Sequence, residues 1–143
     1  MTINSRNKGA TFERDIAREL ELLTGVSFKR NLEQSRAVDH CDLIPDDPAF
    51  PFSLELKRYA AGTGCKAAWK EQSARAACNA GKTPAVIFKF DRQDVRVAIP
   101  LCSVMGSDGW WFGREGPWVE MPLDAFACVA SEIMAAQAPA VPL

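Results

Sequence analysis

A helical segment between two strand-like segments limits the fold of this chain more than any other feature. Phe50–Tyr59 and Pro84–Phe90 are rich in the aliphatic and aromatic residues that strands favour. Between them, Lys66–Ala80 is rich in alanine, which is typical of a helix, and Gly81 follows at the position where helices commonly end. A helix that crosses over a sheet returns the chain in the same direction, so we predict that Pro84–Phe90 lies parallel to a strand already present.

The segments around this unit complete an α/β pattern. Asn7–Thr24 is predicted to be a helix, and Val26–Leu32 and Ala37–Ile44 are predicted to be strands that form an antiparallel meander with Phe50–Tyr59. Val95–Ile99 alternates apolar and polar residues and is expected to pair back as a hairpin. The apolar positions of the first helix recur at near-helical spacing: Phe12, Ile16, Leu20 and Leu23.

The C-terminal part differs in composition from the rest. Met105–Val119 is rich in glycine and tryptophan, and we predict a loop with short irregular strands. Leu123–Gln137 is predicted to be a final helix, and Ala138–Leu143 a frayed tail. A chain of 143 residues suits one compact domain. We therefore expect a single domain over residues 1–143, with a core of about residues 5–100 and an extension of about residues 101–143.

Composition excludes several classes of protein. No apolar run approaches the roughly 20 residues of a membrane span, and Met1–Lys8 lacks the apolar region of a secretory signal. Five cysteines, odd in number and without a CxxC pair, argue against a structural zinc site and favour reduced thiols in a cytoplasmic protein. Cys78 and Cys128 lie among alanines on predicted helices, and we expect both in the core.

Charge is distributed unevenly, although the net charge is only −1. Met1–Arg30 holds six Lys/Arg against four Asp/Glu, and Asn31–Leu56 holds one against six. Lys57–Arg96 holds nine against three, and Val97–Leu143 one against five. Clustered acids suit a metal site and flanking bases suit a phosphate backbone, whereas ordinary solvated helix faces explain the bases equally well.

Three acids and one lysine are the strongest candidates for functional residues. Alternation along a strand places Glu55 and Lys57 on one face, and a hairpin can place Asp42 on the neighbouring strand. Glu13 lies on the first predicted helix. Together they could bind a divalent cation beside a water. Each has a plainer alternative: an ion pair on an exposed edge strand for Glu55 and Lys57, a turn acid for Asp42, and a solvated helix residue for Glu13.

The combined order of these residues resembles the PD-(D/E)XK nuclease superfamily. Within it, Asn7-Lys8-Gly9-Ala10-Thr11-Phe12-Glu13-Arg14 is similar to the start of archaeal-type Holliday junction resolvases and their phage relatives. The resemblance spans about residues 8–99. It implies a restriction-endonuclease-like α-β-β-β-α-β core, with a mixed central sheet flanked by helices. In this chain a Trp/Gly-rich extension and a terminal helix follow that core.

The resemblance also implies roles for individual residues. Glu13, Asp42 and Glu55 would bind one or two Mg²⁺ ions, with Mn²⁺ as an alternative. Lys57 would orient the attacking water and stabilise negative charge, since neighbouring carboxylates favour its protonated form, and Gln72 would support it. The family's proline before the aspartate is replaced here by Cys41.

Asp39 competes with Asp42 for the aspartate position. We favour Asp42, because Leu43 and Ile44 continue an apolar strand after it. His40 is the only histidine and neighbours both acids, so a site role and a structural or exposed position both stay open.

DNA contacts are expected from basic residues near the site and on the second helix: Lys8, Arg14, Lys29, Arg30, Arg36, Lys66, Lys70 and Arg75. Trp110, Trp111 and Trp118 could stack on unpaired bases, or form a packing cluster or dimer contact.

The resemblance leads us to expect a metal-dependent endodeoxyribonuclease that resolves Holliday junctions in DNA recombination and repair. A homodimer would supply the two active sites that symmetric cutting needs. The alternatives are a restriction- or repair-type nuclease acting on duplex or single-stranded DNA, a non-catalytic DNA-binding module of the same fold, and a small structural or interaction protein.

Overall fold

Parallel pairing of the two strands around one helix forms the centre of the fold. The structure, a computed structural model, describes residues 5–32, 40–105 and 116–138. Strands β3 (Phe52–Tyr59) and β4 (Thr83–Phe90) run parallel and pair along their whole length. Helix α2 (Ala67–Ala80) connects them and ends at Gly81, whose φ of 66° is in the left-handed region that glycine tolerates. The predicted crossover is confirmed.

The sheet has six strands among the described residues, in the order β1-β2-β3-β4-β5-β6. All neighbours except β3 and β4 are antiparallel, so the predicted meander of the first three strands and the hairpin of β4 with β5 are both confirmed. The remaining strands are β1 (Phe28–Arg30), β2 (Leu43–Pro45), β5 (Arg96–Pro100) and β6 (Trp118–Pro122).

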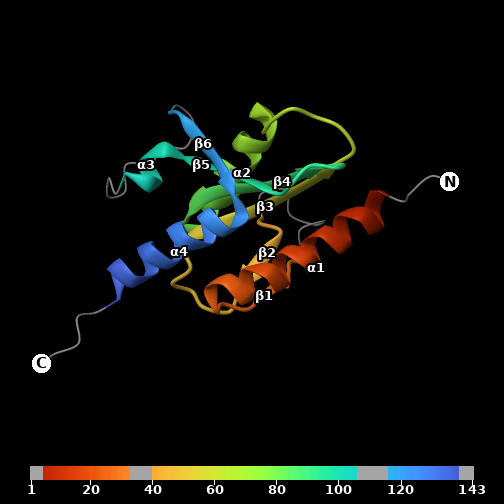
Figure 1. Cartoon of the computed structure of the whole chain (residues 1–143). Coiled ribbons are helices and arrows are strands. Elements are labelled where there is room, and N and C mark those ends of the chain that lie inside the picture. Colours follow the sequence, from red (N-terminus) through yellow and green to blue (C-terminus); the bar gives the residue numbers. More distant parts are fainter. Residues whose placement is uncertain (1–4, 33–39, 106–115, 139–143) are drawn as a thin grey trace, which may run out of the picture.

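Helices cover both faces of this sheet (Figure 1). Helices α1 (Ser5–Thr24) and α4 (Leu123–Gln137) pack on one face, and α2 packs on the other. The larger core cluster lies under α1 and α4 and includes Phe52, Leu54 and Leu56 of β3. The smaller cluster lies under α2 and is mostly aromatic: Trp69, Val86, Phe88, Phe90 and Ala98. Because β3 alternates, Ser53, Glu55, Lys57 and Tyr59 belong to the α2 face.

The second predicted strand is shorter in the structure. It begins at Leu43 instead of near Ala37, and residues 37–39 lie outside the described part of the chain. Asp42 occupies a bend immediately before β2, although its backbone is bonded on both sides. Its carbonyl accepts the Asn31 N–H at 2.9 Å, and its own N–H donates to the Leu54 carbonyl at 2.8 Å.

The C-terminal segment is more regular than its composition indicates. Residues 106–115 lie outside the described residues, but β6 is a five-residue strand paired with β5, so the prediction of irregular strands up to Val119 is wrong there. A short helix α3 (Leu101–Val104), which we did not predict, precedes the gap. The predicted Leu123–Gln137 helix is confirmed, and its Phe126 ring packs edge-on against Phe52 at 4.9 Å between centroids.

Two cysteines predicted to lie in the core are exposed, and so is one of the regularly spaced apolar residues of the first helix. Cys78 and Cys128 point away from the sheet, because α2 and α4 contact it through other positions of their helical repeats. Leu23 lies in the last turn of α1 and is 47% exposed, whereas Phe12, Ile16 and Leu20 are buried as expected. No helix in the described ranges is long and apolar enough to cross a membrane.

Candidate active site

Asp42 and Glu55 face each other across two neighbouring strands. Leu43 of β2 pairs with Leu54 of β3 in antiparallel register, which places the preceding Asp42 opposite the following Glu55. Both residues are buried, at 8% and 3% exposure. The alternative of an exposed edge strand is therefore wrong, because β3 lies inside the sheet and α2 covers this face of it.

Backbone groups hold Asp42 in place. Its Oδ2 accepts the Leu56 N–H at 2.6 Å, in addition to the two backbone bonds described above. The neighbouring Asn31 side chain is buried and donates from Nδ2 to the Cys41 carbonyl at 2.9 Å, which fixes the residue just before the aspartate. The carboxylate is thus held in one orientation by strand β3 and by the end of β1.

Glu55 has one engaged oxygen and one free oxygen. Its Oε1 lies 3.3 Å from the Lys57 ammonium, as expected for residues on one strand face. Its Oε2 is buried and has no hydrogen-bond partner among the described residues. A buried carboxylate oxygen without a partner is costly, and it indicates a position that a cation or water occupies.

Helix α2 fixes the lysine. Lys57 Nζ donates to Gln72 Oε1 at 2.8 Å, so the residue that the resemblance implies would support the lysine is in direct contact with it. The Lys57 side chain is 16% exposed and lies between Glu55 and Gln72. The Lys57 ammonium therefore lies beside the two carboxylates, and one of its three N–H donors remains available for another group.

Burial raises the pKa values of both carboxyls, and the charge on Glu55 adds to the rise at Asp42. The pKa of Asp42 rises to about 8, chiefly because burial disfavours its charged form and then because of the charge on Glu55. The Leu56 N–H and Lys57 oppose this rise only partly. The pKa of Glu55 is also raised by burial, against the lowering effect of Lys57. Without a cation, the pair retains a proton at neutral pH.

Glu13 lies close enough for its charge to raise the pKa of both carboxyls, yet it is engaged elsewhere. Its Oε2 accepts from Arg30 Nε at 2.7 Å, and its side chain is only 12% exposed. In residues 5–32, 40–105 and 116–138, no three His, Cys, Asp or Glu side chains already converge as metal ligands. Asp42 and Glu55 are therefore the carboxylates best placed to bind a cation, whereas the neighbouring Glu13 is engaged in an ion pair with Arg30.

The donor set suits a hard divalent cation. Mg²⁺ prefers carboxylate oxygens, keeps several of its waters and needs only one or two protein carboxylates. Asp42 and Glu55 offer such oxygens, including the unpartnered Glu55 Oε2. A dication between them would also offset the repulsion by Glu55 that adds to the raised pKa of Asp42. The residues present therefore fit a divalent metal.

The basic residues predicted to contact DNA lie in different environments. Lys8 pairs with Asp91 at 2.8 Å and Arg30 with Glu13, whereas Arg14, Lys29 and Arg75 are exposed. Lys66 is exposed at the start of α2, and Lys70, one turn later, is half-buried over the Trp118 ring at 5.8 Å. Arg36 lies outside the described residues.

The structure describes only some of the other residues for which the sequence left a site role open. His40 is exposed, while Asp39, Trp110 and Trp111 lie outside the described residues. Trp118 is half-buried and packs against the smaller core cluster, which supports the packing alternative for this tryptophan.

Sequence reasoning missed several residues that organise this region. Asn31 anchors the chain before Asp42, and no pattern singled it out. Arg58 binds Asp91 at 2.7 Å, so Asp91 joins α1 to the end of β3 through Lys8 and Arg58. Tyr59 stacks on Trp69 beyond Lys57. The alternation of Glu55, Lys57 and Tyr59 on one strand face was the signal that could have found the tyrosine.

Comparison with known proteins agrees with this geometry. A family model described as "Phage putative PDDEXK endonuclease" matches residues 4–108, well over half of the chain. Among solved structures, the fold is similar to that of Hjc, a Holliday junction resolvase from the archaeal hyperthermophile Archaeoglobus fulgidus. The TM-score is 0.54 at 19% sequence identity, over 86% of this chain and 98% of that chain. No curated protein matches the sequence. The predicted restriction-endonuclease-like fold is confirmed.

The raised pKa of Asp42 predicts an unusual dependence of stability on pH. The folded protein keeps the Asp42 proton up to about pH 8, whereas the unfolded chain releases it near pH 4. Metal-free wild type should therefore lose stability as pH rises through this window. Asp42→Asn cannot ionise but can still accept the Leu56 N–H. In urea unfolding under EDTA, we expect the variant to be more stable than wild type by about 2 kcal/mol at pH 8.

The same comparison at about pH 4 is the control, because the unfolded aspartate then keeps much of its proton and the advantage should nearly vanish. An unchanged difference between the two pH values would contradict the electrostatic account of the pair. Asp47→Asn is a matched variant, since Asp47 is half-buried in the turn after β2 and should show no such gain.

Proposed function

The chain belongs to the family of phage PDDEXK endonucleases, and on that premise we propose that it is a divalent-metal-dependent endodeoxyribonuclease that cuts four-way DNA junctions. The observation that carries this proposal is the unpartnered Oε2 of Glu55, buried opposite Asp42 and beside Lys57. Two carboxylates with a free oxygen suit Mg²⁺ or Mn²⁺, and the adjacent lysine suits the charge of a phosphate.

In this proposal each residue has one task. Asp42 and Glu55 bind the cation, which when bound lowers the pKa of a coordinated water and neutralises charge on the scissile phosphate. Lys57, held by Gln72 at 2.8 Å, donates to the phosphate oxygens as negative charge develops on them. The oxygen of water bonds to phosphorus and the water gives up one proton to solvent, while the bond from phosphorus to the leaving oxygen breaks and that oxygen takes up a proton from solvent. Gln72 acts as a positioning residue for Lys57.

Glu13 is the third proposed ligand, and its pairing with Arg30 supports a coupling between metal and DNA. A phosphate that binds Arg30 would compete with Glu13 for the guanidinium. Release of Arg30 would free the Glu13 carboxylate beside Asp42 and Glu55. The arrangement would therefore complete the metal site only when DNA is present.

The substrate and the assembly state are further parts of the proposal. A shared fold with a Holliday junction resolvase supports branched DNA, and symmetric cutting of a junction supports a homodimer with two active sites. The cysteines in the described residues are all free, which supports a reducing, cytoplasmic setting. Recombination and repair are the processes in which such a nuclease would act.

Three DNA substrates distinguish this function from its alternatives. The protein is incubated with a synthetic four-way junction, a linear duplex and a supercoiled plasmid, each with Mg²⁺ or with EDTA. We expect paired symmetric nicks only in the four-way junction, and only when Mg²⁺ is present. Cutting of all three DNAs would favour a restriction- or repair-type nuclease, and binding without cutting would favour a non-catalytic module.

Removal of the lysine tests the proposed chemistry. Lys57→Ala deletes the cation that stabilises charge on the phosphate, so we expect cleavage to slow by about 10²- to 10³-fold. The single-turnover rate under Mg²⁺ and the dissociation constant for the junction under EDTA are measured together. Lys89→Ala is the matched control, because Lys89 is half-buried on the opposite face of the adjacent strand β4 and should cleave at the wild-type rate. Full Mg²⁺-dependent cleavage by Lys57→Ala would show the assignment to be wrong.

Removal of the arginine tests the competition for Glu13. We expect Arg30→Gln to bind Mn²⁺ about fivefold more tightly in calorimetry without DNA, because breaking a charge-assisted bond frees the carboxylate. The same variant should bind the junction more weakly, since a phosphate contact is lost. The double variant with Glu13→Gln should lose the gain in metal affinity. If Arg30→Gln and wild type bind Mn²⁺ equally, Glu13 is not a latent ligand.

A further inference from the structure

Two consecutive contacts join β3 to α2 on the face that carries the proposed active site. The first is the hydrogen bond of Lys57 with Gln72 at 2.8 Å. The second is the stack of Tyr59 on Trp69, with ring centroids 5.2 Å apart and planes 18° apart. Residues two apart on a strand lie about 7 Å from each other on one face. The Tyr59 ring is therefore one step along β3 from the lysine.

The stack has a rigid base and an open end. Trp69 is only 5% exposed and touches Phe88 and Phe90, with centroids at 6.0 and 6.1 Å. Tyr59 is the outermost ring of this series and is 45% exposed. Trp69 covers one face of the tyrosine, so the exposed area lies on the other face and the rim. We call Tyr59 on Trp69, with Lys66 beside both rings, the aromatic platform.

Positive charge lies at the edge of the aromatic platform. The Lys66 ammonium is 5.5 Å from the Tyr59 centroid and 5.4 Å from the Trp69 centroid. Lys70 lies one helical turn further along α2, over Trp118. An aromatic face next to lysines matches a nucleotide, whose base stacks while its phosphate meets the ammonium groups.

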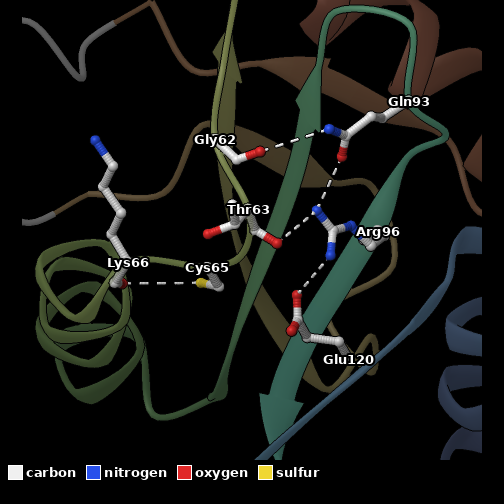
Figure 2. A network of polar contacts seen from close by, with 7 residues as sticks. All are labelled: Gly62, Thr63, Cys65, Lys66, Gln93, Arg96 and Glu120. Atoms are coloured by element: carbon white, nitrogen blue, oxygen red, sulfur yellow. Dashed lines mark hydrogen bonds and ion pairs between the residues drawn. The ribbon is translucent and has the colours of Figure 1, made fainter.

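A network of polar contacts holds the loop that carries Lys66 (Figure 2). Arg96 of β5 donates to the Thr63 carbonyl at 3.3 Å and to Gln93 Oε1 at 3.1 Å, and Gln93 Nε2 donates to the Gly62 carbonyl at 3.5 Å. Arg96 also pairs with Glu120 at 3.5 Å, which ties the loop to β6. In Figure 2 the Lys66 side chain extends away from this network.

Close packing also fixes the loop at Gly62. A Cβ at this position would lie 2.2 Å from Cε1 of the Phe90 ring, so only glycine fits there. Phe90 in turn contacts Trp69, and the loop is therefore held against the same aromatic series that supports Tyr59. The aromatic platform is pre-organised from below by the core and from the side by the loop.

We propose that the aromatic platform binds an unpaired nucleobase next to the phosphate to be cut. A base inside a duplex is stacked on both sides and cannot offer a face to Tyr59, whereas a base at a branch point, bulge or end can. The site would thereby select DNA in which pairing is interrupted beside the scissile phosphate. This inference rests on the proposed nuclease function, because it assigns the base contact to the same DNA that meets Lys57.

The test compares two DNAs and three proteins. One DNA is a duplex with a single unpaired 2-aminopurine nucleotide, and the other is the same duplex with that base paired to thymine. Wild type, Tyr59→Phe and Tyr59→Leu are titrated against both by fluorescence anisotropy under EDTA. Phenylalanine keeps the aromatic ring, and leucine keeps an apolar contact with Trp69 but has no flat face on which a base can stack. Both variants should therefore retain the fold, and thermal unfolding checks that they do.

We expect Tyr59→Leu to bind the bulged DNA about 5- to 100-fold more weakly than wild type, from the loss of one stacked base. Its affinity for the paired duplex should stay within about twofold, and Tyr59→Phe should match wild type on both DNAs. The 2-aminopurine emission in the bulged complex should be lower with wild type and Tyr59→Phe than with Tyr59→Leu, because stacking quenches it.

Equal affinities of Tyr59→Leu and wild type for the bulged DNA, or equal losses on both DNAs, would overturn the inference. The cleavage assay on the four-way junction is run in parallel with wild type. Junction cleavage together with an unaffected Tyr59→Leu would reject the aromatic platform alone. Wild type that neither binds nor cuts any of these DNAs would overturn the proposed function and the platform together.

Discussion

The parallel pairing of β3 with β4 is the constraint on which the site depends. Parallel neighbours need a crossover, and the crossover helix α2 lies over the β3 face that holds Glu55, Lys57 and Tyr59. On an edge strand, Glu55 and Lys57 would be a solvent-exposed ion pair worth less than about 1 kcal/mol. Under α2 the same two residues become a buried acid with an unpartnered oxygen and a lysine held by Gln72.

The buried carboxylates make the site a source of instability that a ligand can relieve. Asp42 and Glu55 face each other with raised pKa values, and the only cation in direct contact with the pair among the described residues is Lys57. The Leu56 N–H compensates Asp42 only partly. The fold therefore holds two acids where they repel each other, which is the arrangement expected of a site that a divalent cation completes. The charge of the third acid, Glu13, is offset within the fold by its ion pair with Arg30.

Local sequence patterns predicted the parts of the structure that depend on local periodicity and alternation. The Leu123–Gln137 helix, the crossover, and the shared face of Glu55 and Lys57 were all predicted, because each follows from a regular repeat. Local sequence patterns gave wrong predictions where contacts with residues distant in the sequence determine the structure. Asp42 lies at a bend whose backbone is bonded to Asn31, just after β1, and to β3. Strand β6 forms because it pairs with β5, and Cys78 and Leu23 are exposed because their helices contact the core through other positions. The engagement of Glu13 by Arg30 depends on two side chains 17 residues apart, which no spacing rule predicts.

The central claim is that Asp42 and Glu55 together bind a divalent cation. Crystals of the wild-type protein soaked in Mn²⁺ at about pH 8, near the raised pKa of Asp42, test this directly through anomalous scattering, because a bound dication favours loss of the remaining proton. The account predicts a strong peak within coordination distance of Asp42 and of Glu55 Oε2, and its loss in Glu55→Gln crystals under the same conditions. Mn²⁺ bound only elsewhere on the protein, or a peak that persists unchanged in Glu55→Gln, would contradict the account.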